Sequence, residues 1–143
     1  LPDKIQEVLQ PNQSALDDDR IRFPTLAELN QVRQLNPHEV QDLLRAVPAP
    51  LVLDVREPDE YTGEFGHIPG SLLVPLKDLP ARAAELEVYR DWHIIAVCRA
   101  GVRSTTATAI LTGLGFERVS NLKGGMLEWN EQNLPVERDQ PTP

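Results

Sequence analysis

Two stretches of the chain carry hydrophobic side chains at the spacing of an amphipathic helix. In each stretch the apolar positions follow the order i, i+3, i+4, i+7. They are Val40, Leu43, Leu44 and Val47 in the first stretch, and Ala107, Ile110, Leu111 and Leu114 in the second. Asn36, Pro37 and Glu39 form a typical helix start, and Pro48 ends the first pattern. Gly115 follows the second, as is common at helix C-termini. We therefore expect two helices that each pack one face.

Short apolar runs elsewhere predict strands. They lie at residues 51–55, 71–74, 94–98 and 118–122. Nearly continuous apolar runs of this length are typical of parallel strands buried on both faces. Residues 76–86 predict a further helix interrupted at Pro80, and 126–132 a last helix. Because strands and helices alternate, the pattern predicts an α/β fold with a mostly parallel sheet. In such sheets, functional sites lie at the carboxyl ends of strands.

The hydrophobic pattern also predicts where the domain begins and ends. We expect the folded domain over residues 36–135, preceded by an N-terminal extension or linker over 1–35 with a short helix near Ile5–Leu9. Residues 136–143 are expected to form a flexible tail. The chain starts without Met and without the apolar segment of a signal peptide, which suggests a processed chain or part of a longer one.

Composition narrows the functional classes. The 143 residues are 41% hydrophobic and 25% charged, as in an ordinary globular protein. The apolar runs are far shorter than the roughly 20 residues of a membrane-spanning helix. A net charge of −8 argues against nucleic acid or an anionic membrane as partner, so any anion site must be local. One cysteine and three histidines show no metal-ligand spacing, and no cofactor is implied. A single cysteine is consistent with a reducing compartment, and we expect a cytoplasmic location.

The single cysteine lies where a reactive thiol is expected. Cys98 ends the apolar run 94–97 and precedes a short loop with Arg99, Gly101 and Arg103, which leads into the second predicted helix. Arginines and a helix N-terminus both favour the thiolate over the thiol. Glycine lets backbone N–H groups turn inward, as in anion-binding nests. The alternative is a small buried hydrophobic residue, but two neighbouring arginines would be a poor environment for an inert thiol. The chemistry also requires that solvent reach the sulfur.

At this point the sequence resembles the rhodanese-like sulfurtransferases. Four segments carry the resemblance in the family's order, over roughly residues 36–135: 53–57, 64–71, 98–104, and 121–126 followed by Trp129. The resemblance implies a rhodanese-like fold, a five-stranded mostly parallel sheet flanked by helices on both faces. It also implies a double displacement. Cys98 takes a sulfane sulfur from a small anionic donor, thiosulfate or glutathione persulfide, and its persulfide passes the sulfur to a thiol or cyanide.

The resemblance also assigns roles to residues. Cys98 is the nucleophile, and the substrate-binding loop consists of Arg99, Ala100, Gly101, Val102, Arg103 and Ser104. Arg99 and Arg103 are expected to hold the anionic group of the donor. Arg56, after the strand at 51–55, lies either at the mouth of the pocket or in a structural ion pair with Asp54, and the second alternative is favoured because buried charges are usually paired.

The residues also bear on three alternatives. Cysteine-dependent phosphatases that share this fold usually place five residues between cysteine and arginine, whereas four separate Cys98 from Arg103, and Val97 stands where they usually have His. A non-catalytic rhodanese-like domain that regulates or binds a partner stays open, although such domains typically lack the cysteine. Residues 1–5 weakly resemble the end of persulfide dioxygenases of the metallo-β-lactamase fold, which suggests a fused or associated dioxygenase.

Overall fold

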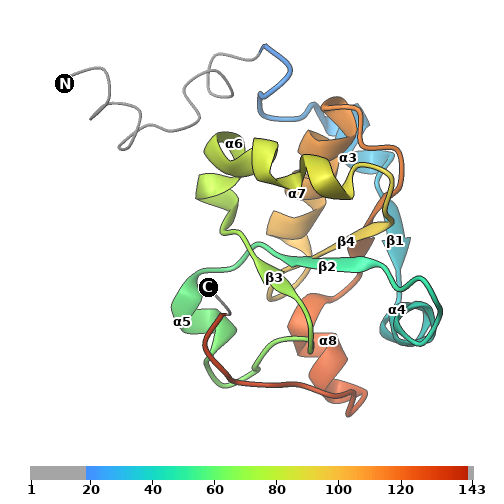
Figure 1. The fold of residues 1–143 in the computed structure, drawn as a ribbon, viewed down its shortest axis with the longest axis vertical. Coiled ribbons are helices and arrows are strands. Elements are labelled where there is room, and N and C mark those ends of the chain that lie inside the picture. The colour runs from blue at the N-terminus through green and yellow to red at the C-terminus, as the bar shows by residue number, and fades with distance from the viewer. Residues whose placement is uncertain (1–18, 142–143) are drawn as a thin grey trace.

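A five-stranded sheet forms the centre of the molecule in the computed structural model, which describes residues 19–141 (Figure 1). The strands are β1 (Arg33–Leu35), β2 (Leu51–Asp54), β3 (Leu72–Leu73), β4 (Ile94–Val97) and β5 (Val119–Leu122). Their order is β1-β5-β4-β2-β3, and every neighbouring pair is parallel. The helices are α3 (Leu26–Asn30), α4 (Pro37–Leu44), α5 (Pro58–Tyr61), α6 (Leu79–Arg82), α7 (Val102–Gly113) and α8 (Gly125–Glu131). The predicted α/β fold with a parallel sheet is confirmed.

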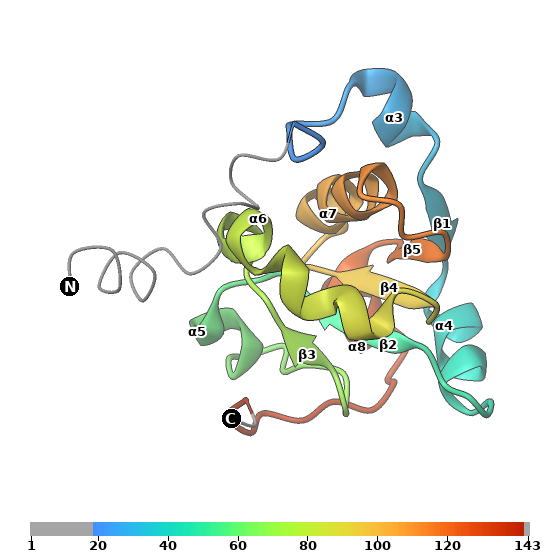
Figure 2. The ribbon, with the colours of Figure 1, turned by 45° about the horizontal axis from the view of Figure 1, so that its top comes forward.

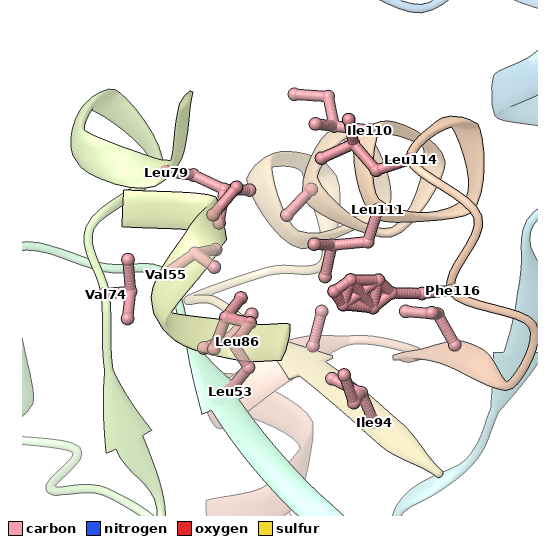
Figure 3. Close-up of a cluster of buried hydrophobic side chains, with 14 of the residues drawn as sticks. Leu53, Val55, Val74, Leu79, Leu86, Ile94, Ile110, Leu111, Leu114 and Phe116 are labelled. Atoms are coloured by element: carbon pink, nitrogen blue, oxygen red, sulfur yellow. The ribbon is translucent and has the colours of Figure 1, made fainter. Parts of the chain in front are cut away.

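Helices cover both faces of the sheet, because successive side chains of a strand point to opposite faces. Leu53 and Ala96 pack on the face covered by α6 and α7, in the cluster that Figure 3 shows around Phe116. Val52 and Ile95 pack on the other face, against α4 and α8. Figure 1 shows α6 and α7 on one side of β2 and β4, with α4 and α8 on the other. The central strands are thus buried on both faces.

Helix α4 begins as predicted and ends early. The Asn36 side chain accepts a hydrogen bond from the Glu39 N–H at 2.9 Å, and Glu39 accepts one from the Asn36 N–H at 3.0 Å. The helix ends at Leu44, so Val47 does not belong to its packed face and is 97% exposed. A tight turn, in which the Ala46 N–H donates to the Leu43 carbonyl, ends the helix before Pro48. Proline disfavours helical geometry at the residue that precedes it.

The region predicted as one helix over 76–86 is three short pieces. A 3₁₀ turn at Leu76–Asp78 is followed by α6, and a second 3₁₀ segment covers Ala83–Tyr89. Pro80 lies in the first turn of α6, where its missing N–H is tolerated.

Ordered structure extends beyond the predicted domain limits at both ends. Strand β1, in the predicted extension, pairs with β5 from Arg33↔Ser120 to Leu35↔Leu122. At the other end, Glu137 exchanges backbone hydrogen bonds of 2.8 and 2.9 Å with His67. Figure 2 shows this C-terminal segment running past β3 toward α5. The predicted tail therefore lies against the domain as far as it is described. The helix expected near Ile5–Leu9 lies outside the described residues.

Among the residues described, no helix is both long enough and apolar enough to cross a membrane.

Candidate active site

Two hydrogen-bond donors converge on the sulfur of Cys98. The residue directly follows β4, and its Sγ accepts hydrogen bonds from the Gly101 backbone N–H at 3.0 Å and from the Ser104 hydroxyl at 3.2 Å. Gly101 has a φ of 101°, a left-handed conformation that glycine adopts without strain. In that conformation the backbone N–H of Gly101 points toward the sulfur. Because hydrogen bonds strengthen when the acceptor is ionised, both donors would bind an anionic sulfur more strongly than a neutral one.

The sulfur also lies at the start of a long helix. Helix α7 has 12 residues, and its N-cap is Gly101, which has no side chain with which to cap the first turn. The first backbone N–H groups of a helix lack partners within it and carry a partial positive charge. The N-terminus of α7 therefore adds to the positive potential around Cys98.

Helix α8 is hydrogen-bonded to the backbone of the loop that begins at Cys98. The N–H groups of Met126 and Leu127 donate to the carbonyls of Cys98 and Arg99 at 2.9 and 3.0 Å. The C=O and N–H of a trans peptide point in opposite directions. The amide N–H groups of these two loop peptides are thereby turned away from α8. A Cβ on Gly125 would lie 2.4 Å from the Cys98 carbonyl oxygen, so this close approach requires glycine. Residue patterns alone do not predict this role, although the Gly124-Gly125 pair is a signal for a close backbone approach.

The side chains of the two loop arginines contact the segment between β2 and β3. Arg103 donates to both carboxylate oxygens of Glu60 at 2.7 and 2.8 Å. Arg99 is exposed, with its guanidinium carbon 5.5 Å from the centre of the Phe65 ring. The hydrogen bonds from Arg103 lower the pKa of Glu60 to about 2. The pKa of Arg103 is raised, chiefly by the hydrogen bond to Glu60 and less by the charge of Glu60.

Arg56 does not lie at the mouth of a pocket. Its side chain is 1% exposed and binds Asp54 through Nε at 3.0 Å and Nη2 at 2.7 Å. It also donates to the backbone carbonyls of Glu60 and Gly66. Its guanidinium is occupied by these four acceptors, an arrangement that does not favour a role in substrate binding. The alternative of a structural ion pair is what the structure contains.

Cys98 itself is buried, with 1% of the residue exposed, which differs from the accessible thiol that the chemistry requires. On the outside of the loop, Ala100 is exposed and Val102 is 76% exposed. Ser104, whose hydroxyl contacts the sulfur, is buried. The side chains of Ala100 and Val102 thus face solvent while the sulfur faces inward, so a reagent reaches Sγ only after some covering atoms move.

Comparison with known proteins agrees with this architecture. The family model described as the rhodanese-like domain matches residues 36–132. A sulfurtransferase of Allochromatium vinosum is 33% identical over 105 residues, which are 73% of this chain and 94% of that protein. An HTH-type transcriptional regulator of Mycobacterium tuberculosis is 41% identical over 92 residues, which are 63% of this chain and 38% of the regulator.

A solved structure shows the same fold. The crystal structure of a rhodanese-related protein from Thermoplasma volcanium aligns with a TM-score of 0.66 and 33% identity, over 75% of this chain and 99% of that one. The sulfurtransferase relative supports sulfur transfer as the general activity. From the match of the family model to most of its length, we conclude that this chain belongs to the rhodanese-like domain family.

Proposed function

We propose that this protein is a sulfurtransferase that carries a sulfane sulfur on Cys98 as a persulfide. The observation that carries the proposal is the position of Sγ between the Gly101 N–H and the Ser104 hydroxyl, at the N-terminus of α7. These groups stabilise negative charge on sulfur without a histidine base, which is one route to an activated thiol nucleophile.

With thiosulfate as donor, the reaction takes two steps. The Cys98 thiolate attacks the outer sulfur of thiosulfate, the S–S bond of the donor breaks, and sulfite leaves with the bonding electron pair. The product is an anionic persulfide on Cys98. A cyanide ion or a thiolate then attacks the outer sulfur, and the Cys98 thiolate is released as the leaving group. Both steps are transfers of one sulfur atom, so no external oxidant or reductant takes part.

Positive charge beside the sulfur supports an anionic donor. Arg99 is exposed and lies in the loop itself, so its guanidinium is free to swing from Phe65 toward a sulfonate or a carboxylate. Thiosulfate and glutathione persulfide both carry such groups. The remaining charge comes from the N-terminus of α7. A reducing compartment such as the cytoplasm would keep the single thiol available for these donors.

The proposal is tested with thiosulfate and cyanide by following thiocyanate over time. We expect turnover by the native chain and none by Cys98→Ala. Thr106→Ala, which changes helix α7 outside the substrate-binding loop and keeps the sulfur, serves as the control. Turnover that persists in Cys98→Ala would remove the basis of the proposal.

A second function is a rhodanese-like domain that regulates or binds a partner without turnover. The burial of Cys98 favours it, and one relative is a transcriptional regulator. In that case no sulfane donor leaves a sulfur on Cys98, and the native chain gives no thiocyanate above the level of Cys98→Ala.

A further inference from the structure

One side chain of this protein already occupies the anion-binding face of an active-site arginine. The two Nη atoms of Arg103 lie 2.7 and 2.8 Å from the two carboxylate oxygens of Glu60. This paired geometry is the one in which a guanidinium binds an oxyanion of a ligand. A sulfonate or carboxylate from a donor would need the same pair of N–H groups.

Glu60 is held in this position from its backbone and from its side chain. Its carbonyl accepts a hydrogen bond at 3.2 Å from the buried Arg56, and its Oε1 accepts one at 3.2 Å from the backbone N–H of Glu57. Its carboxylate is ionised at neutral pH, and the hydrogen bonds from Arg103 lower its pKa further, to about 2. An anion that approaches Arg103 therefore meets a fixed negative charge.

We propose that Glu60 determines donor specificity: its carboxylate occupies the oxyanion subsite of Arg103, and the anionic group of a donor must displace it. The inference rests on the proposed function, because Glu60 can select donors by their charge only if the protein takes sulfur from a donor. In the free protein Glu60 stands in for that anionic group. Glu60 weakens the binding of a dianion such as thiosulfate, and it keeps other small anions from occupying the site.

Binding of thiosulfate, measured by calorimetry on the full chain, tests the proposal without any turnover. The comparison is between Cys98→Ala and the double variant Cys98→Ala/Glu60→Gln. Removing a fixed negative charge a few ångströms from a dianion is expected to tighten binding about tenfold. Unchanged or weaker binding in the double variant overturns the proposal, because it means that Glu60 does not compete for Arg103.

Two further variants separate the subsite from net charge. Glu87→Gln removes the same charge from a paired Glu–Arg contact with Arg90, which lies before β4, at the end of the strand away from Cys98. Added to Cys98→Ala, it should leave the affinity unchanged. Arg103→Ala, added to the Glu60→Gln double variant, should abolish the gain. A gain in affinity from Glu87→Gln, or one that survives the loss of Arg103, overturns the proposal.

A measurement on Cys98→Ala with Glu60 intact covers the case in which Glu60→Gln does not fold. The carboxyl carbon of Glu60, followed by NMR, should shift as thiosulfate saturates the protein, since the carboxylate leaves Arg103. A signal that does not move at saturation overturns the proposal. Because these readouts need no reaction, a chain that binds thiosulfate as expected and transfers no sulfur would refute the proposed function and leave the role of Glu60 intact.

Discussion

The hydroxyl of Ser104 donates a hydrogen bond to the Sγ of Cys98 over 3.2 Å. A hydrogen bond to a charged acceptor contributes about 1.5–3 kcal/mol. We therefore expect Ser104→Ala to slow the single-turnover release of sulfite from thiosulfate by about tenfold or more. Thr106→Ala, which removes a hydroxyl from the same helix, is the control and should leave the rate within about twofold. An unchanged rate in Ser104→Ala would show that the hydroxyl does not stabilise the reacting sulfur.

The approach of α8 to the active-site loop predicts a strong effect at Gly125. Its φ is +57°, and an added Cβ would lie 2.4 Å from the Cys98 carbonyl oxygen. Gly125→Ala should therefore displace the loop, lower the rate of sulfite release and reduce the free energy of unfolding measured with urea. Gly70→Ala is the matched control, because Gly70 has a φ of +81° but nothing within 4 Å of an added Cβ.

Gly70→Ala should cost about 1–2 kcal/mol from backbone strain alone and keep its activity. Equal losses of stability and equal activities in the two variants would contradict the account of the Gly125 contact.

The buried pair of Asp54 and Arg56 predicts a loss of stability. Both side chains are 1% exposed, with Arg56 Nη2 and Asp54 Oδ2 at 2.7 Å. Removing one partner of a buried ion pair leaves an uncompensated charge and costs about 3–5 kcal/mol. We expect Asp54→Asn to lower the free energy of unfolding by roughly this amount. Lys77→Gln, which breaks an exposed ion pair with Glu57 at 3.1 Å, should cost far less, because solvent screens exposed charges.

The same comparison decides what Arg56 does. Folded Asp54→Asn protein should keep the KM of the native chain for thiosulfate. A raised KM for thiosulfate without any loss of stability would instead support a role for Arg56 in binding the donor.

The ion pair between Glu60 and Arg103 predicts that part of the folding stability is lost at low pH. The pKa of Glu60 is lowered from 4.5 to about 2, so the folded state holds this carboxylate ionised more strongly than the unfolded state does. The stabilisation is complete above the unfolded pKa and is lost as the pH falls from about 4.5 through 2. The Tm of the native chain should exceed that of Glu60→Gln at pH 6, and the difference should shrink toward pH 2. A difference that stays constant over this range would contradict the assignment.

Local sequence signals predicted the central fold and the position of Cys98 directly after β4. The capping residues after Asn36, the apolar run before Cys98 and the glycine of its loop each act over a few positions, so their structural consequences can be predicted without the fold. Strand β1 was missed because it has three residues, of which Arg33 and Gln34 are exposed, and its pairing with β5 comes from the tertiary fold.

The partners of the site residues could not be predicted in the same way. Glu60 and Arg103 are 43 positions apart in the sequence, and only the fold brings them together. The hydrogen bond from the Met126 N–H to the Cys98 carbonyl is likewise between backbone atoms and leaves no trace in side-chain chemistry. The burial of Cys98 also depends on how the loop and its neighbours pack, which residue types alone do not determine.

The central claim is that Cys98 carries the transferred sulfur. Its most direct test is mass spectrometry of the intact chain and of its peptides after brief treatment with thiosulfate and removal of the excess. The account predicts a gain of one sulfur atom, located on the peptide that holds Cys98, lost on addition of cyanide and absent from Cys98→Ala. A native chain whose mass is unchanged with thiosulfate and with glutathione persulfide would contradict the account.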